Sequence, residues 1–239
     1  MAKILTCRNL TRNFDHFSLK DIDVSLEEGY LTGLTGGNGA GKTTLLRILA
    51  GLDLRFRGEV FIGGISVREA PLKTRELTGY VSEDLQPFWE KTALENGDLI
   101  GSYFENYEKS CLEQWLDRLG VPGNLPVHGL SKGDTMKFFC CMALSHKPKL
   151  LLLDEPASGF DPVFRREFLS LLRELTDQGI SVLMTSHITE DLEHTADYLL
   201  RLENGRLVQY ESIEDFHDRF PGKRLAELFP GSVHIHDLL

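Results

Sequence analysis

The stretch Gly36-Gly37-Asn38-Gly39-Ala40-Gly41-Lys42-Thr43-Thr44 decides the expected fold of this chain. Apolar residues precede it at 30–34 and follow it at 45–50, so the predicted order is strand, glycine-rich loop, helix. The pattern G-x-x-x-x-G-K-[ST] needs this order before it indicates a phosphate site. Glycines without a Cβ atom let the loop turn tightly and bring its backbone N–H groups to phosphate oxygens.

The residues at the end of this loop add charge and a hydroxyl. The positive end of the helix that starts near Lys42 would face the phosphates, and the Lys42 ammonium would reach the β- and γ-phosphates. Thr43 offers its hydroxyl to Mg²⁺. The alternative interpretation is a flexible turn, which does not require Lys and Thr at this spacing. The sequence therefore predicts nucleotide binding.

Composition excludes several classes of protein. The 239 residues carry a net charge of −10, which argues against nonspecific attraction to DNA or to an anionic membrane, and we expect no nucleic-acid partner. We find no apolar run long enough to span a bilayer and no signal-peptide core, so we expect a soluble, cytosolic chain. Cys7, Cys111, Cys140 and Cys141 have neither metal-ligand spacing nor a disulfide pattern, which indicates buried, reduced thiols.

Two further strands end in residues suited to catalysis. The apolar run 150–153 leads into Asp154 and Glu155, and the run 180–185 leads into Ser186 and His187. Ligands bind at the carboxyl ends of strands in parallel sheets, where Asp154 can face a metal and Glu155 an attacking water. The alternatives are a solvated turn for the acids and a structural role for the histidine. Their combination with the glycine-rich loop favours the catalytic interpretation.

The rest of the chain is typical of an α/β protein. Residues 4–24 mix apolar and polar stretches as antiparallel strands do, and the region of about 85–145 has helical character. We expect a hairpin at Gly63-Gly64, a strand over 77–82, a capping box at Thr92, helices over 105–119 and from Ser131 to His146, a helix from Asp161 to Gly179, and a hairpin at Asn204-Gly205.

Two interpretations near the ends of the chain stay open. Phe14, ahead of the loop, could stack on an adenine ring or belong to a strand face, and Phe17 is its rival for the same role. In the tail, a helix is expected over 213–220. His234 and His236 have no other ligand cluster near them in sequence, so we interpret them as surface residues rather than metal ligands.

The ordered set GGNGAGKTT, LSKGD, LLLLDEP, ASGFDP and TSH resembles the ATP-binding cassette family, the nucleotide-binding subunits of ABC transporters. The resemblance covers about residues 3–212. It implies a P-loop NTPase (RecA-like) core with an antiparallel β subdomain and an α-helical insertion. We accordingly expect a cassette domain over 1–215, with the insertion at about 85–145, and a short extension over 216–239.

The resemblance also implies roles for individual residues. Glu155 matches the general base, His187 the switch histidine that contacts the γ-phosphate, and Asp161 an acid at the dimer interface. Ser131 and Gly133 match signature residues that contact ATP bound to the opposite subunit. The implied metal ligands are Thr43, Glu83 and Asp154, and the implied ATP-binding residues are Phe14, Gly36, Asn38, Gly39, Ala40, Gly41, Lys42, Thr43, Thr44, Ser131 and Gly133.

Three residues depart from the family pattern. Lys132 and Asp134 replace the first Gly and the Gln of Leu-Ser-Gly-Gly-Gln, and Asp134 adds negative charge near the triphosphate, which bears on dimer affinity. Glu83 replaces the usual glutamine, and its carboxylate is a better ligand for a hard cation. Some bacterial exporter-type cassettes share the Lys and the acid, and the chain is most similar to them.

The expected function is an ATPase that powers a separate membrane permease, by export, through ATP-driven closure of a homodimer or heterodimer. Such a subunit would lie at the cytoplasmic face of the membrane. One alternative is a non-transport cassette ATPase, although the DNA-repair kind carries a long coiled coil and the ribosomal kind usually two cassettes. Another is a regulatory module that binds ATP without hydrolysing it, against which Glu155 and His187 argue.

Overall fold

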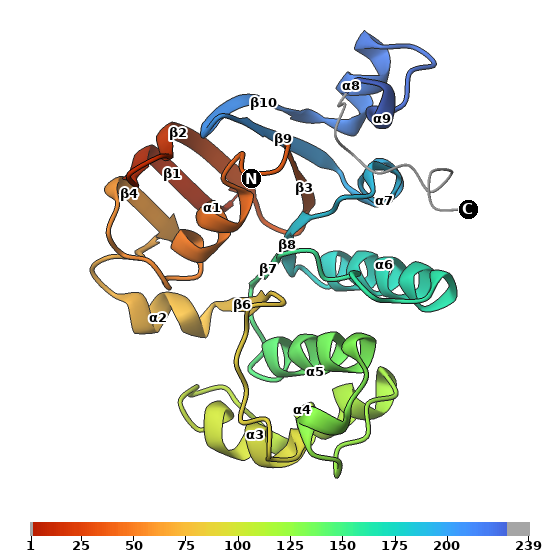
Figure 1. Ribbon diagram of the computed structural model, residues 1–239. Coiled ribbons are helices and arrows are strands. Elements are labelled where there is room, and N and C mark those ends of the chain that lie inside the picture. Colours follow the sequence, from red (N-terminus) through yellow and green to blue (C-terminus); the bar gives the residue numbers. More distant parts are fainter. Residues whose placement is uncertain (1, 229–239) are drawn as a thin grey trace.

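The computed structural model describes residues 2–228, which form two β-sheets with helices packed around them (Figure 1). The larger sheet has the order β10-β9-β3-β8-β7-β6 and is parallel from β9 to β6, with β10 antiparallel at the edge. Its central strands are buried along their whole length, as continuous apolar runs predict. The strands are β3 (Leu31–Thr35), β6 (Thr78–Val81), β7 (Leu150–Leu153), β8 (Ser181–Thr185), β9 (Tyr198–Glu203) and β10 (Arg206–Ser212).

The second sheet is antiparallel and has the order β2-β1-β4-β5. It confirms the antiparallel strands expected from the amino-terminal pattern and the hairpin at Gly63-Gly64. Its buried face packs on helix α1 (Lys42–Leu49), whose leucine and isoleucine side chains join the same apolar core. The strands are β1 (Lys3–Asn13), β2 (Ser18–Glu27), β4 (Arg57–Ile62) and β5 (Ile65–Ser66).

Helices of the middle third gather at one end of the molecule, away from the antiparallel sheet (Figure 1). The capping box at Thr92 is confirmed, because its hydroxyl accepts the Glu95 N–H while Glu95 caps in return. The predicted helix over 105–119 begins later, since Tyr107 folds back onto Gly97 and Gly101. The elements of this group are α3 (Ala93–Gly101), α4 (Lys109–Arg118), the 3₁₀ turn η1 (Val127–Gly129) and α5 (Lys132–Leu144). Helix α2 (Pro71–Glu76) lies apart from them, beside the antiparallel sheet, where it contacts β5 (Figure 1).

The remaining helices lie in the last third of the chain. Asp161 caps α6 (Pro162–Asp177) by accepting the N–H groups of Val163 and Phe164, as the Asp-Pro pair predicts. The helix expected over 213–220 is present. His234 and His236 lie outside the described residues. The other elements are α7 (Thr189–Thr195), α8 (Ile213–Arg219) and α9 (Leu225–Leu228).

The cysteines are free thiols, as expected. Cys7, Cys140 and Cys141 are buried, and burial raises the pKa of the Cys7 and Cys140 thiols to about 12. The expected burial was wrong for Cys111, which is only half-buried because it lies near the start of the surface helix α4. Over residues 2–228, none of the helices combines the length and the apolar character that crossing a bilayer demands.

Candidate nucleotide site

A cavity of about 810 Å³ opens beside the carboxyl ends of β3, β6, β7 and β8. Parallel strands deliver their following loops to one edge of the sheet, so residues distant in sequence meet here. The cavity is lined by His16, Phe17, Asn38, Gly39, Ala40, Gly41, Lys42, Thr43, Thr44, Ser82, Glu83, Asp84, Lys132, Asp154, Glu155, Ser158 and His187.

The glycine-rich loop leads from β3 into α1 and presents the amino end of that helix to the cavity. A Cβ atom on Gly36 would lie 2.4 Å from the Leu202 carbonyl oxygen, and one on Gly41 would lie 2.7 Å from Phe17. Glycine is required at Gly36 by close approach to a backbone atom and at Gly41 by a φ of 107°, which side chains rarely adopt. The Lys42 Nζ donates to the carbonyl oxygens of Gly36 at 2.7 Å and Gly37 at 3.3 Å.

Thr185 connects Asp154 and Glu155, the two acids that directly follow β7. Its hydroxyl donates to Asp154 Oδ1 at 2.8 Å and accepts the backbone N–H of Glu155 at 2.9 Å. Asp154 is buried, so this hydrogen bond helps to offset the cost of desolvating its carboxylate. Sequence reasoning gave Thr185 no role. The available signal was a hydroxyl residue at the end of the strand that neighbours the acids.

Glu155 and His187 contact each other at the far side of the cavity. Glu155 Oε2 accepts the His187 backbone N–H at 3.0 Å, and Oε1 lies 3.3 Å from His187 Nε2. Burial raises the pKa of Glu155, while His187 and Lys42 oppose that shift. Glu155 has a φ of 53°, a left-handed conformation that is strained for a side chain of this size. Among the described residues Oε1 forms no hydrogen bond beyond this contact with His187.

Glu83 follows β6 and enters the cavity opposite the loop. Its Oε1 lies 2.9 Å from Lys132 Nζ, which also donates to Ser158 Oγ at 3.3 Å. Hydrogen bonds from Ser158 and Lys132 hold the pKa of Glu83 below its ordinary value. The carboxylate is therefore ionised at neutral pH.

The proposed metal ligands Thr43, Glu83 and Asp154 all line this cavity. Within residues 2–228, no group of three or more His, Cys, Asp or Glu side chains is arranged to hold a metal ion. Mg²⁺ in phosphate sites uses one or two carboxylates together with phosphate oxygens and waters. One hydroxyl and two carboxylates therefore fit Mg²⁺ that arrives with a triphosphate.

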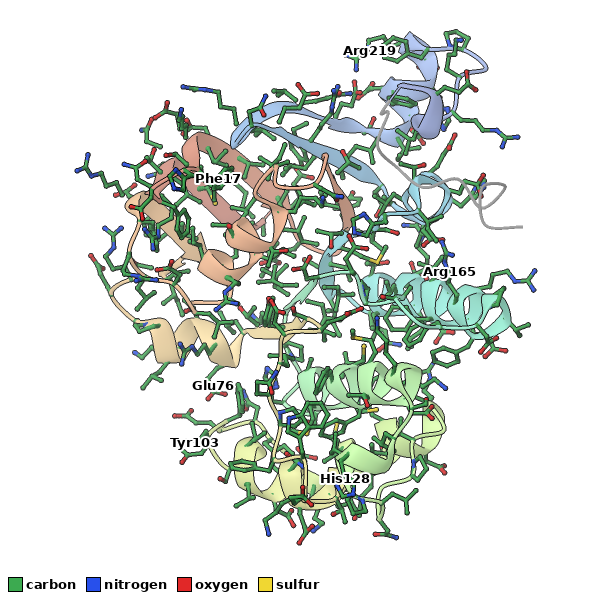
Figure 2. All side chains as sticks on the ribbon, viewed as in Figure 1. Phe17, Glu76, Tyr103, His128, Arg165 and Arg219 are labelled. Carbon is green, nitrogen blue, oxygen red and sulfur yellow. The ribbon has the colours of Figure 1, made fainter. Side chains whose placement is uncertain are left out.

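Some residues singled out in the sequence lie elsewhere. Phe14 does not line the cavity, and its ring carries the Arg12 guanidinium at 4.1 Å from the centroid, whereas its rival Phe17 does line it. Figure 2 labels Phe17 on the antiparallel-sheet side of the molecule. Gly36, Ser131 and Gly133 are also absent from the lining. The Ser131 hydroxyl caps α5 and donates to Asp134 Oδ2 at 2.8 Å.

These features define a class of protein. A glycine-rich loop at a helix amino end, an acid on the neighbouring buried strand and a carboxylate base at the same sheet edge are the parts of a P-loop nucleoside triphosphatase. The core is joined to an antiparallel β subdomain and to a group of helices, which confirms the fold class expected from the sequence. The boundaries 1–215 and 85–145 remain predictions.

Comparison with known proteins gives the family. Residues 19–158 match the ABC transporter family. The chain is 33% identical to an uncharacterized ABC transporter ATP-binding protein of Methanocaldococcus jannaschii, over 90% of this chain and 80% of the relative. It is 30% identical to the Nod factor export ATP-binding protein I of Cupriavidus pinatubonensis, over 96% of this chain and 72% of the relative. The solved structure of an ATP binding subunit of an ABC transporter superposes with a TM-score of 0.84 at 26% identity, covering 94% and 97% of the two chains.

The chain belongs to the ABC transporter family, as the resemblance implied. It is an ATP-binding subunit of a transporter and an ATPase.

Proposed function

We propose that this subunit binds Mg²⁺·ATP in the cavity between Lys42 and the pair Glu155 and His187, and that hydrolysis there drives a membrane permease. One observation carries the proposal. Lys42, Asp154, Glu155 and His187 come from distant parts of the chain and line a single cavity. A site that hydrolyses ATP must above all stabilise the negative charge on the phosphoryl group that is transferred.

Each side chain has a defined task in this proposal. Lys42 exchanges the carbonyl oxygens of its own loop for β- and γ-phosphate oxygens. The Glu155 carboxylate accepts a proton from the attacking water, and His187 holds that carboxylate in place. Mg²⁺ held by Thr43, Asp154 and Glu83 would supply positive charge to the phosphate oxygens. Phe17, rather than Phe14, is placed to stack on the adenine ring.

The site is completed by a second cassette, either a copy of this chain or a different one. Ser131 is exposed at the start of α5, and neither it nor Gly133 reaches the cavity of its own chain. Both residues are therefore free to contact the γ-phosphate of ATP bound to a facing subunit. ATP would then join the two subunits, and loss of the γ-phosphate would let them separate.

The permease docks, in this proposal, on the hollow between β6 and the helices of the middle third. A cavity of about 320 Å³ there, which we call the β6–α5 groove, is lined mainly by apolar side chains, among them Leu52, Ile100, Phe104, Phe139 and Met142. The polar residues Arg75, Tyr80 and His146 also belong to its lining. A partner that covers this apolar lining would gain affinity from its removal from water.

Exposed apolar side chains surround this groove. Tyr103 and Leu72 are 87% and 73% exposed, and both line an adjoining hollow together with Glu76. Figure 2 shows Glu76 and Tyr103 on the same side of the molecule. Apolar surface of this kind supports a protein interface. The subunit would then lie at the cytoplasmic face of a membrane, and the Nod factor export relative supports the direction of export.

Two measurements test the proposal. Purified protein should bind ATP and hydrolyse it in the presence of Mg²⁺, and binding without turnover would instead favour the regulatory alternative. Tyr103→Asp should abolish co-purification of a multi-span membrane protein with the tagged subunit and its stimulation of ATP hydrolysis. Val208→Asp changes an exposed valine on β10 and serves as the matched control. Equal loss in both variants would contradict docking at the groove.

A further inference from the structure

Lys132 connects three segments of the nucleotide site within one chain. It is the first residue of α5, its ammonium contacts Glu83 after β6, and it donates to Ser158 in the turn that follows Glu155. Its aliphatic stem lies over Gly159, where a Cβ atom would be 3.4 Å away. The ion pair therefore connects the start of α5 to the edge of the cavity in the same chain.

Each member of the Lys132–Glu83 pair is placed where a second interaction bears on it. Glu83 lines the cavity together with Thr43 and Asp154, so a divalent cation held by these residues competes with Lys132 for the same carboxylate. Lys132 in turn is placed at the positive end of a helix, which is an unfavourable position for a cation without a counter-ion. Both side chains remain partly exposed, at 61% for Lys132 and 43% for Glu83, so exchange of partners needs no rearrangement of the core.

We propose that Lys132 is a positioning residue that neutralises Glu83 while the nucleotide site is empty and releases this carboxylate when Mg²⁺·ATP binds. This inference rests on the proposed function, because it needs a cation site at Glu83. The freed ammonium stands between Ser131 and Gly133, the residues proposed to meet the partner's γ-phosphate. Binding of Mg²⁺·ATP to one subunit thereby adds positive charge at the start of its α5, the surface proposed to contact the nucleotide of the other subunit.

A purely structural ion pair would behave differently. Its removal would lower the unfolding temperature of the protein but would leave the effect of Mg²⁺ on ATP affinity unchanged. The discriminating quantity is therefore the ratio of ATP affinity with Mg²⁺ to ATP affinity in EDTA. This ratio can be measured by titration of single subunits, without turnover, dimer formation or a permease.

The experiment uses full-length protein and a fluorescent ATP analogue. Lys132→Met keeps the stem over Gly159 and removes the charge, so we expect the affinity ratio to rise about two- to five-fold, the range that an exposed ion pair contributes. Lys132→Arg keeps the charge and should match the wild type. Glu83→Gln should lower the ratio, and Lys132→Met should have no further effect in that background. Lys109→Met breaks a remote ion pair with Asp98 and is the control.

Each outcome decides one question. An unchanged ratio in Lys132→Met, or a rise that persists in the Glu83→Gln background, would overturn the exchange of partners. Lys132→Gln also removes the charge and keeps part of the aliphatic stem, so it keeps the test decisive if Lys132→Met does not fold. Failure of the wild type to bind the analogue would instead count against the proposed function.

Discussion

The carboxylate of Glu155 is held against His187 by two contacts, one from the backbone N–H at 3.0 Å and one from the ring Nε2 at 3.3 Å. The two residues follow neighbouring parallel strands, β7 and β8, and Thr185 links the same strand ends through its hydroxyl. These contacts fix the Glu155 carboxylate at the edge of the cavity from two strands. Its orientation is set before any substrate binds.

Glu155→Gln should reduce ATP turnover by about 100-fold or more, because a general base contributes at least that factor. The amide keeps the shape of the side chain, so ATP affinity should stay near that of the wild type. Single-turnover hydrolysis and equilibrium titration measure the two quantities. Glu167→Gln on the exposed face of α6 is the control, and an unchanged rate in Glu155→Gln would remove the assigned base.

Lys42→Ala should weaken ATP binding at least about tenfold, since it removes a charge-assisted contact to the phosphates. In the free protein Lys42 bonds only loop carbonyl oxygens among the described residues, so the unfolding temperature should change little. Titration calorimetry checks the affinity. Lys149→Ala, at an exposed lysine ahead of β7, should bind normally, and normal binding by Lys42→Ala as well would argue against the loop as phosphate site.

Ser131 should be required for ATP-dependent pairing of subunits but not for ATP binding by one subunit. Ser131→Arg tests this in a Glu155→Gln background, where the paired state accumulates, but it also loses the cap of α5. Ser131→Asp keeps a good cap and places a negative charge against the phosphate. Both variants should elute as monomers with ATP on size exclusion, and a dimer from Ser131→Asp would contradict contact across the interface.

Asp134→Asn should strengthen pairing. The Asp134 carboxylate accepts a hydrogen bond from the Ser131 hydroxyl, with 2.8 Å between Oδ2 and Oγ. A phosphate of the partner subunit's ATP must therefore compete for that donor. The substitution also removes a negative charge near the triphosphate. We expect pairing with ATP at about two- to five-fold lower protein concentration, measured by sedimentation. Asp117→Asn on α4 is the control, and weaker pairing in Asp134→Asn would show that the Asp134 ion pair with Lys137 matters more.

His146 should make stability fall as pH decreases. Burial lowers its pKa, and the hydrogen bond to the Thr78 carbonyl offsets only part of the shift. The unfolded chain therefore takes up the proton first, near pH of about 6.5, and the free energy of unfolding decreases below that pH until the folded histidine also titrates.

His146→Gln keeps a donor for Thr78 but does not titrate, so its urea midpoint should drop less than that of the wild type between about pH 7.5 and about pH 5.5. The control variant is His128→Gln, at an exposed histidine. An equal drop in all three proteins would assign the pH dependence to other groups.

Local patterns were sufficient for most single elements of the fold. The spacing of Gly36, Gly41 and Lys42 between an apolar run and a helix predicts a phosphate loop, and the capping residues Thr92 and Asp161 predict helix starts that the structure contains. These signals work because they depend on neighbours within a few residues. The start of α4 was predicted too early, since Tyr107 is held by packing against Gly97 and Gly101 rather than by its own neighbours.

Contacts between distant segments were not predictable in this way. The sequence left Phe14 and Phe17 as rivals, and only the packing of β1, β2 and α1 brings Phe17 to the cavity. The hydroxyl of Thr185 gains its role from the pairing of β7 with β8. Glu83 and Lys132 were noted as departures from a family pattern, yet their pairing required coordinates.

The sequence by itself determined the strand-loop-helix unit around Lys42, the acids Asp154 and Glu155, and the family to which the chain belongs, because each is encoded by residues adjacent in the chain. Tertiary structure decided which side chains share the cavity and which distant groups contact each other there, such as Glu155 with His187 and Glu83 with Lys132. Those properties depend on how the sheets and helices pack, and packing joins residues whose separation along the chain carries no signal of their contact.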